Sequence, residues 1–197
     1  MRVKYLKTLL MCLLLSACAN TKITENWLDH ENSKSYLHPM IIGITDSQQT
    51  RQIYEKHFVA ELAKKNITAT PSYTLISSKQ KINRETVSNA IKDTQIDSVL
   101  VSYLVSVDSK LTHYDSPINT GYSGDTDNMM SDTLVSKRGR ASSTEVIELK
   151  NDLYDVKSKA IIWSVQTETV APESIDQAIV DVTVVIIKQL FDDRVLK

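Results

Sequence analysis

The sequence predicts a single α/β domain in which helices cover a mixed sheet of about five strands. Three observations support this class: short apolar runs typical of buried strands, amphipathic stretches between them, and two alternating segments separated by a short turn near the end of the chain. The expected order is strand-helix-strand-helix-strand, followed by a hairpin and a last helix. The length of 197 residues suits one domain of ordinary size.

The first strand is expected at residues 40–45, an apolar run with the pattern of a strand buried on both faces. A helix should follow over residues 48–65, with Asp46 or Ser47 as its N-cap. Its buried stripe is expected to contain Ile53, Tyr54, Phe58 and Leu62. Asn66 suits the left-handed position that often ends a helix.

Two further strands and a helix complete the first half of the domain. The strand at residues 69–76 contains Pro71 and is therefore expected near a sheet edge. A second helix is expected over residues 84–94, with Asn83 as its N-cap. The strongest strand pattern lies at residues 99–107. If the three strands run parallel, the right-handed crossover rule places both helices on one face of the sheet.

The second half begins with a long polar segment, residues 108–142, which is expected to form a loop. The arms of the predicted hairpin are residues 143–156 and 160–170. A last helix is expected over residues 174–192, capped by Ser174. Its buried side is expected to contain Ile175, Ile179, Val182, Ile186 and Leu190.

Residues 1–17 have the features of a bacterial signal peptide. Three basic residues precede an apolar run at residues 9–15, which is shorter than the roughly 20 residues that span a bilayer. The run ends in Leu15-Ser16-Ala17-Cys18, which matches a lipobox, so cleavage is expected between Ala17 and Cys18, with lipidation of Cys18. An ordinary secretory signal cut after Ala17, or a weak membrane anchor, is the alternative.

The lipobox predicts where the domain is held. Two or more acyl chains on Cys18 would make a stable membrane anchor. The next residue is Ala19 rather than Asp, which in the Gram-negative sorting convention favours the outer membrane, with the domain on its periplasmic face. Residues 18–39 are polar and are expected to form a tether, with Trp27 packed on the domain, which spans residues 40–193.

Charge and cysteine content exclude some kinds of function. Of 23 basic residues, three lie in the signal segment, so the rest of the chain carries 20 basic against 24 acidic side chains, a net charge of about −4. This balance argues against nucleic-acid binding, which needs a basic surface. Cys12 would leave with the signal and Cys18 would be lipidated. No thiol would then remain for a nucleophile or a metal.

Several short motifs resemble those of uncharacterised Gram-negative outer-membrane lipoproteins. They are residues 40–46, Pro71-Ser72-Tyr73, Ile96-Asp97-Ser98-Val99-Leu100-Val101, Leu153-Tyr154-Asp155-Val156 and Ile162-Trp163-Ser164. The resemblance covers residues 27–191. The wider architecture is similar to the N-terminal domain of TolB, the curli-secretion lipoproteins and the lipoprotein activators of penicillin-binding proteins. It implies a periplasmic interaction module rather than an enzyme, and it carries over no catalytic motif.

No catalytic or nucleotide-binding motif is recognised. A phosphate-binding loop needs several glycines, whereas only Gly43 lies between a predicted strand and helix, where close helix-on-sheet packing explains it. Gly121-Tyr122-Ser123-Gly124 differs from a nucleophile elbow in the position of its second glycine. A carboxylate pair of the glycosidase type stays open, because the sequence does not show distances between acids.

No metal site is predicted. The four histidines show no ligand spacing; they are His30, His38, His57 and His113. Asp125-Thr126-Asp127 begins like a calcium-binding loop, but Met129 and Met130 stand where a ligand and the turn glycine belong. A solvated loop is the better interpretation, and no cofactor is expected.

The 108–142 loop is the predicted contact surface. It contains aromatic, methionine and arginine residues of the types that interfaces favour: Tyr114, Tyr122, Met129, Met130, Arg138 and Arg140. One hypothesis is therefore a non-enzymatic lipoprotein that binds an envelope protein or a second copy of itself. The alternative is a small periplasmic hydrolase or ligand-binding protein that uses the loop as a lid.

Overall fold

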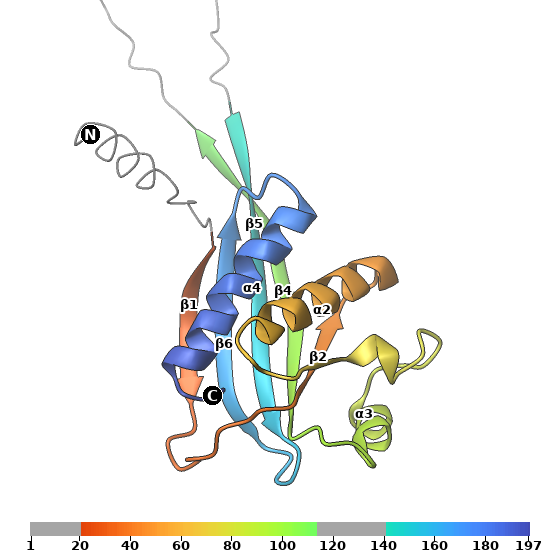
Figure 1. The fold of residues 1–197 in the computed structure, drawn as a ribbon. Coiled ribbons are helices and arrows are strands. Elements are labelled where there is room, and N and C mark those ends of the chain that lie inside the picture. Colours follow the sequence, from red (N-terminus) through yellow and green to blue (C-terminus); the bar gives the residue numbers. More distant parts are fainter. Residues whose placement is uncertain (1–20, 114–140) are drawn as a thin grey trace, which may run out of the picture.

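The computed structural model describes residues 21–113 and 141–197 and confirms the α/β class. The elements, in order, are β1 (Thr21–Leu28), β2 (Pro39–Ile44), α2 (Gln48–Ala63), β3 (Thr70–Pro71), the 3₁₀ turn η2 (Ser72–Thr74), α3 (Arg84–Ile91), β4 (Ser98–His113), β5 (Ala141–Asp155), β6 (Ile161–Val170) and α4 (Ile175–Asp192). They form one six-stranded sheet of order β1-β6-β5-β4-β2-β3 (Figure 1). β2 runs parallel to β3 and β4, and the other pairs are antiparallel.

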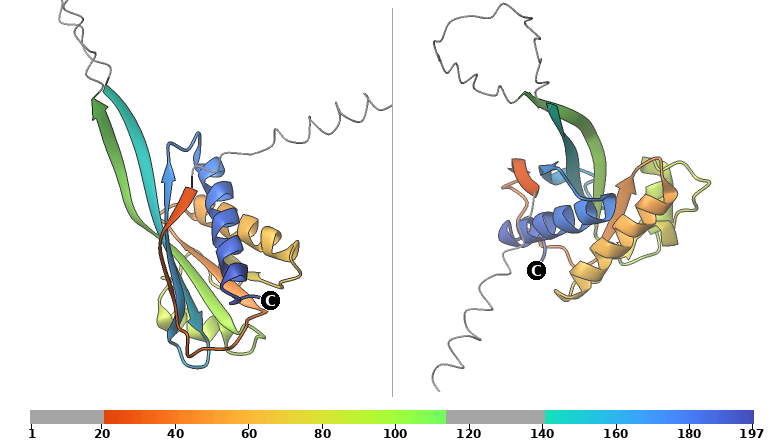
Figure 2. Two further views of the ribbon diagram at one scale, coloured as in Figure 1. Left: turned by 90° about the vertical axis from the view of Figure 1, so that its left-hand side faces the viewer. Right: turned by 90° about the horizontal axis from the view of Figure 1, so that it is seen from above.

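The helices are divided between the two faces of the sheet. α2 and α4 cover one face, here called the front, while α3 lies against the other, the back (Figure 2). The expectation that the first two helices share a face is therefore wrong. Helices share a face when successive parallel strands are added in the same direction, whereas β3 lies on one side of β2 and β4 on the other. Right-handed crossovers in opposite directions place their helices on opposite faces.

The front face holds the main hydrophobic core. Phe58 and Leu62 of α2 pack with Ile186 and Leu190 of α4 around Trp163 of β6, and all five side chains are fully buried. The predicted buried stripes of α2 and α4 are confirmed except for the first residue of each stripe. Ile53 is 39% exposed and Ile175 is 63% exposed, because each lies at the edge of its stripe.

Local capping signals are confirmed. The side chains of Ser47, Asn83 and Ser174 each accept a hydrogen bond from the backbone N–H three residues further on. Asn66 has the expected left-handed backbone, with a φ of 63°, and the Ile67 N–H closes the helix end onto the Leu62 carbonyl at 3.1 Å. These features depend on a few neighbouring residues, which is why the sequence predicts them well.

The expected tether proves to be partly structured. Residues 21–28 form β1, which pairs antiparallel with β6 at the sheet edge, and Tyr36 further along is buried against the core. A polar edge strand with one side toward solvent has no apolar pattern to distinguish it from a tether. Trp27 does not pack on the domain as expected. It lies on the back face opposite Ser164 and is 52% exposed.

Two other segments differ from their predicted lengths. The strand expected at residues 69–76 is reduced to β3, which lies at the sheet edge as Pro71 predicts, and the chain then turns through η2. The predicted loop at 108–142 is shorter at both ends, because residues 108–113 pair as strand with residues 141–146. Within the described ranges, none of the helices is long and apolar enough to cross a bilayer.

Candidate functional site

The most distinctive feature of the fold is a two-stranded ribbon that leaves the sheet. β2 pairs with β4 only as far as Ile44 and Tyr103, and β6 pairs with β5 only from Val146 onward. From Asp108↔Val146 to His113↔Ala141, β4 and β5 continue paired with each other. The five residues beyond the last β6 pair would extend about 17 Å at the usual strand rise. The ribbon projects from one end of the molecule (Figure 1).

A β-bulge lies where the ribbon begins. The β4–β5 register shifts between Leu104 and Ser106, directly after the last pair with β2. A bulge increases the local twist and bends the strand that contains it. This accounts for the way the ribbon curves away from the body of the domain, which is clearest in the left view of Figure 2.

The ribbon edges differ from the outer edges of the sheet. At one outer edge β1 carries a bulge between Ile23 and Glu25, and at the other β3 has two residues, one of them Pro71. Bulges, charges, prolines and short strands all prevent another strand from pairing with an edge. In the described part of the ribbon, by contrast, the outer side of residues 107–113 pairs with no strand.

A cleft of about 280 Å³ lies on the front face at the base of this ribbon. It is bounded by the carboxyl end of β2, the first turns of α2 and α4, and the first described side chains of β5. Its floor is mainly apolar and includes Ile147, Leu149, Ile179 and Val182. Ligand sites of α/β folds commonly lie outside the carboxyl ends of parallel strands, at the point where the strand order reverses. The cleft is at such a point.

Gly43 and Tyr54 shape the floor of this front cleft. A Cβ at Gly43 would lie 3.0 Å from Cδ1 of Tyr54, so the glycine lets the tyrosine ring approach the strand, in agreement with the predicted packing role. The Tyr54 hydroxyl lies 2.6 Å from the Ser102 hydroxyl on β4. Burial raises the pKa of Tyr54, so the phenol stays neutral and serves as a hydrogen-bonding group.

A buried charged network holds the carboxyl end of β2 in place. Glu55 of α2 is fully buried and accepts hydrogen bonds from the Gly43 N–H at 3.0 Å and from the Arg51 Nε at 2.9 Å. The Ser72 hydroxyl donates to the same carboxylate at 2.6 Å, and the Tyr73 N–H donates at 3.0 Å. With four donors, the buried carboxylate is well satisfied, as a buried charge must be. The network joins α2, β2 and η2 beside the cleft.

Sequence reasoning missed this network. No role was predicted for Arg51 or Glu55, yet they share a helix face with Phe58 and Leu62 at spacings of three and four residues. That spacing, with opposite charges four residues apart, is the signal that would have found it.

The front cleft suits apolar contact better than acid–base chemistry. Among the described residues that line it, Glu145 is the one with a carboxylate, and its polar groups are otherwise hydroxyls such as Thr45, Thr50 and Ser102. Ile44 and Ile175 stand at its rim, 40% and 63% exposed. The cleft therefore presents an aliphatic surface with a few hydrogen-bonding groups next to an open strand edge.

The predicted site residues fall in the parts of the chain that the structure does not describe. Cys18, Ala17 and the six contact residues of the loop, Tyr114, Tyr122, Met129, Met130, Arg138 and Arg140, all lie outside the described residues. Gly121-Tyr122-Ser123-Gly124 and Asp125-Thr126-Asp127 lie there too. Lipidation, the loop's contact role and the rejected motifs therefore stay predictions. The described ends of the ribbon lead into and out of the segment that holds the loop residues.

The described histidines are separate from one another. His38 Nδ1 lies 3.9 Å from an Asp97 carboxylate oxygen near the start of β2, and Nε2 of His57 on α2 is buried without a hydrogen-bond partner. The described part of the chain contains no group of three or more metal-ligating side chains.

The fold and the cleft define a class: an α/β protein with a mixed six-stranded sheet, front and back helices, and a projecting β4–β5 ribbon. Comparison with known protein families found no match, and comparison with curated proteins found none either.

Solved structures with a similar chain path include a lipoprotein. The chain is similar to the PelC dodecamer protein from Paraburkholderia phytofirmans, with 11% identity and a TM-score of 0.46, over 86% of this chain and 94% of that one. It is also similar to lipoprotein GNA1162 from Neisseria meningitidis, with 9% identity and a TM-score of 0.42, over 79% of this chain and 98% of that one. Similarity at this level does not extend to function.

Proposed function

We propose that this chain is a lipid-anchored periplasmic protein of the outer membrane that acts as a non-enzymatic interaction or assembly module. The observation that carries the proposal is the β4–β5 ribbon, which leaves the sheet and in its described part has an outer strand edge without a partner strand. Such an edge recognises another chain through backbone hydrogen bonds. The lipobox at Leu15-Ser16-Ala17-Cys18 supports the anchor.

The front cleft adds a second contact to the proposed interface. It lies at the ribbon base, so a strand added to the ribbon would place neighbouring side chains close to it. An apolar side chain of the partner would fill the cleft and pack on its aliphatic floor. The partner is an envelope protein or a second copy of this chain, and the six loop residues named above would extend the same surface.

Site-specific photocrosslinking in intact cells tests this proposal. A photoreactive amino acid at Ser109, in the ribbon, should give a discrete crosslinked product, whereas the same group at Lys157, in the turn at the other end of β5, should not. Deletion of residues 114–140 tests whether the segment between the two ribbon strands contributes to the crosslinked product. Equal crosslinking from Ser109 and Lys157, or none from Ser109, would contradict the role of the ribbon.

The anchor has its own test. Labelled fatty acid should enter the wild-type chain and fail to enter Cys18→Ser, and the wild type should fractionate with outer membranes. Incorporation into Cys18→Ser would contradict the lipobox interpretation, and it would leave the ribbon experiment unaffected.

The second candidate is the small periplasmic hydrolase or ligand-binding protein predicted as the alternative. The observation that favours it is the 280 Å³ front cleft, which is close to the lower size of ordinary ligand sites, about 300 Å³. A small apolar molecule that binds at this cleft, and loses its affinity in Val182→Trp but not in Val184→Trp on the exposed side of α4, would favour this candidate over the first.

A further inference from the structure

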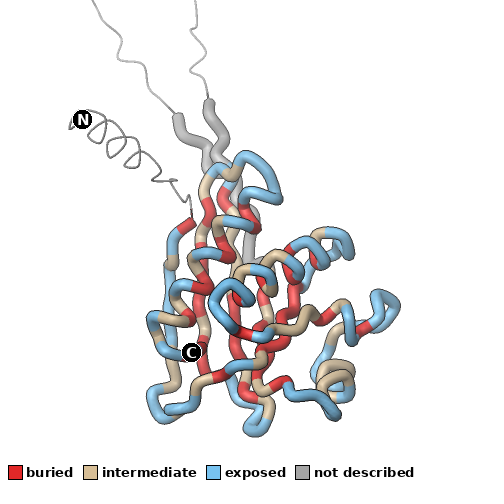
Figure 3. Tube along the Cα trace, viewed as in Figure 1, coloured by how far each residue is buried: buried red, intermediate tan, exposed pale blue. Residues whose placement is uncertain are grey.

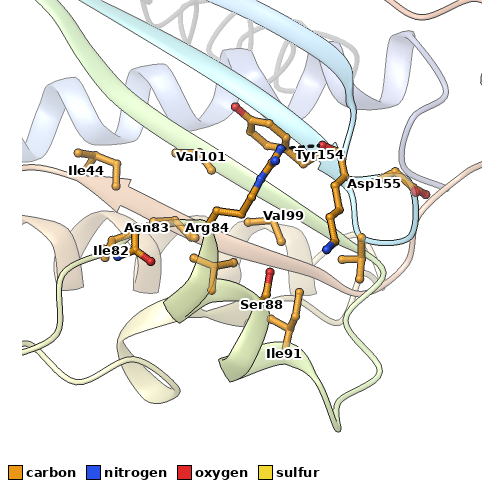
Figure 4. A pocket seen from close by; sticks show the side chains of 14 residues that line it. Ile44, Ile82, Asn83, Arg84, Ser88, Ile91, Val99, Val101, Tyr154 and Asp155 are labelled. Carbon is orange, nitrogen blue, oxygen red and sulfur yellow. Dashed lines mark hydrogen bonds between the residues drawn. The ribbon is translucent and has the colours of Figure 1, made fainter.

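A second cavity lies on the back face, between α3 and the sheet, and is here called the α3 cavity (Figure 4). Its volume is about 320 Å³. The surface is aliphatic, with Ile42, Val99 and Val101 on the sheet facing Val87 and Ile91 on α3. No residue of α3 is fully buried, in keeping with the open space between this helix and the sheet (Figure 3).

Cationic groups stand at the mouth of the α3 cavity. Arg84, the first residue of α3, extends toward Tyr154 on β5, and its Nη2 donates to the Lys159 carbonyl at 3.3 Å. Lys159 also lines the mouth. Neither residue forms an ion pair with any carboxylate in the described parts of the chain.

The carboxylate beside these cations is ionised, and another cation already balances its charge. Asp155 pairs with Lys34 at 3.2 Å and accepts the Tyr36 hydroxyl at 2.9 Å and the Ser158 N–H at 2.6 Å. Burial alone would raise the pKa of Asp155, but these hydrogen bonds together lower it to about 2. Arg84 and Lys159 therefore leave the mouth with excess positive charge.

We propose that the α3 cavity binds one medium-chain fatty acid, with its acyl chain along the aliphatic surface and its carboxylate at Arg84. The methylene chain would gain from burial against Val87, Ile91 and Val101. The carboxylate would form charge-assisted hydrogen bonds with a guanidinium that no described acid satisfies. The volume of the α3 cavity equals that of about ten water molecules in the liquid. The cavity therefore has room for an acyl chain of roughly ten methylene groups.

A peptide is a poorer occupant than an acyl chain. β2 is flanked by β3 and β4, so the sheet under the cavity offers no strand edge to pair with peptide N–H and C=O groups. The Oδ1 of Asn83 already accepts from the Thr86 N–H at the start of α3. Peptide groups in the cavity would therefore lose hydrogen bonds to water without replacement, a cost that methylene groups do not carry.

Photoaffinity labelling tests the site directly. The full-length chain in phosphatidylcholine nanodiscs is irradiated with a diazirine-bearing dodecanoate, and the label is located by mass spectrometry of tryptic peptides. Label should fall on the peptides that contain Val87 and Val101, and excess unlabelled dodecanoate should displace it. An analogue that ends in an alcohol should label these peptides about tenfold less, as expected for loss of a charged hydrogen bond.

Two variants and a matched control separate the parts of the proposal. Arg84→Glu should lower the labelling about tenfold, and it should fold, because an acid suits the first turn of a helix. Lys81→Glu makes the same charge change at an exposed residue that does not line the cavity, and labelling should be unchanged. Ser88→Trp places a large side chain in the cavity and should abolish labelling.

Several results would overturn the proposal. Label spread over the whole surface, or on other peptides, would exclude the site, and undiminished labelling of Arg84→Glu would exclude the carboxylate contact. Equal labelling by the analogue that ends in an alcohol would also exclude the carboxylate contact. Displacement by an apolar peptide and not by dodecanoate would make the cavity a peptide site. If Ser88→Trp does not fold, Arg84→Glu and its Lys81→Glu control decide the matter.

Discussion

The two faces of the sheet are covered to very different degrees. On the front, helices of 16 and 18 residues bury Phe58, Leu62 and Leu190 around Trp163. On the back, the eight-residue α3 buries none of its side chains fully and leaves a 320 Å³ cavity beneath it. A helix of eight residues is about 12 Å long and has room for few inward-facing side chains. The front therefore holds the larger hydrophobic core, and the back has a smaller buried cluster beside the α3 cavity.

The uncovered part of the back face is polar. Asp152 of β5 accepts hydrogen bonds from the Tyr103 hydroxyl at 3.1 Å and the Ser164 hydroxyl at 2.6 Å. Lys150 lies on the same face, and its pKa is raised by the charge of Asp152. Cross-strand polar contacts of this kind stabilise a sheet by small amounts and do not replace a hydrophobic core.

The largest effect is expected at the centre of the front core. Trp163→Ala should lower the free energy of unfolding by about 3–5 kcal/mol, because it leaves a cavity and removes the hydrogen bond from Nε1 to Asp193 at 2.7 Å. Trp27→Ala, on the exposed back face, should cost less than about 1 kcal/mol. Urea unfolding of both variants measures the contrast, and equal losses would contradict it.

Loss of the buried carboxylate beside the front cleft should have the next largest effect. Glu55→Gln should cost about 3 kcal/mol, since Arg51 would remain buried without an opposite charge. The double variant Arg51→Met/Glu55→Leu should recover much of this loss, because it removes both charges. Urea unfolding of the three proteins measures this, and a double variant less stable than the single one would show that the polar contacts to Ser72 and Gly43 matter more than the charge.

Asp155, below the α3 cavity, should make stability depend on pH. Its pKa is about 2 in the folded chain against 3.8 as the ordinary value, so the folded state favours the carboxylate. The resulting stabilisation, about 2 kcal/mol, is present above about pH 5 and is lost as the pH falls from 4 to 2. The stability difference between wild type and Asp155→Asn should therefore shrink over that range. A difference that stays constant down to pH 2 would be the contrary result.

The smallest effect is expected for α3. Val87→Ala should cost about 1 kcal/mol or less, because this side chain is half-buried beside space that is already empty. Urea unfolding, as used for Trp163→Ala, measures this change in the free energy of unfolding of Val87→Ala. A cost of about 3 kcal/mol or more would show that the back face is as tightly packed as the front.

The sequence predicted those parts of the fold that depend on near neighbours. The caps at Ser47, Asn83 and Ser174, the left-handed Asn66 and the buried stripe of α4 each follow from residues within a few positions of one another. The hairpin of β5 and β6 was predicted for the same reason. β1 was missed, because its partner β6 lies more than 130 residues further along the chain.

The candidate site was harder to predict than the fold. The front cleft joins residues from β2, α2, β4, β5, β6 and α4, and no sequence motif marks such a set. The loop residues predicted as a contact surface were chosen by type, because aromatic, methionine and arginine side chains favour interfaces. The ribbon strands were predicted as part of a loop, since their polar residues give no strand pattern without knowledge of the pairing.

The sequence by itself determined the class of the fold, the caps and the front core residues, because each depends on local composition or spacing, and it predicts the lipid anchor for the same reason. Only the tertiary structure decided the position of β3 beside β2, the separation of α2 and α3 onto opposite faces, and the projection of the ribbon. Strand order depends on which apolar surfaces pack together over the whole domain. The spacing of neighbouring residues therefore does not predict it. The front cleft and the α3 cavity both follow from that order.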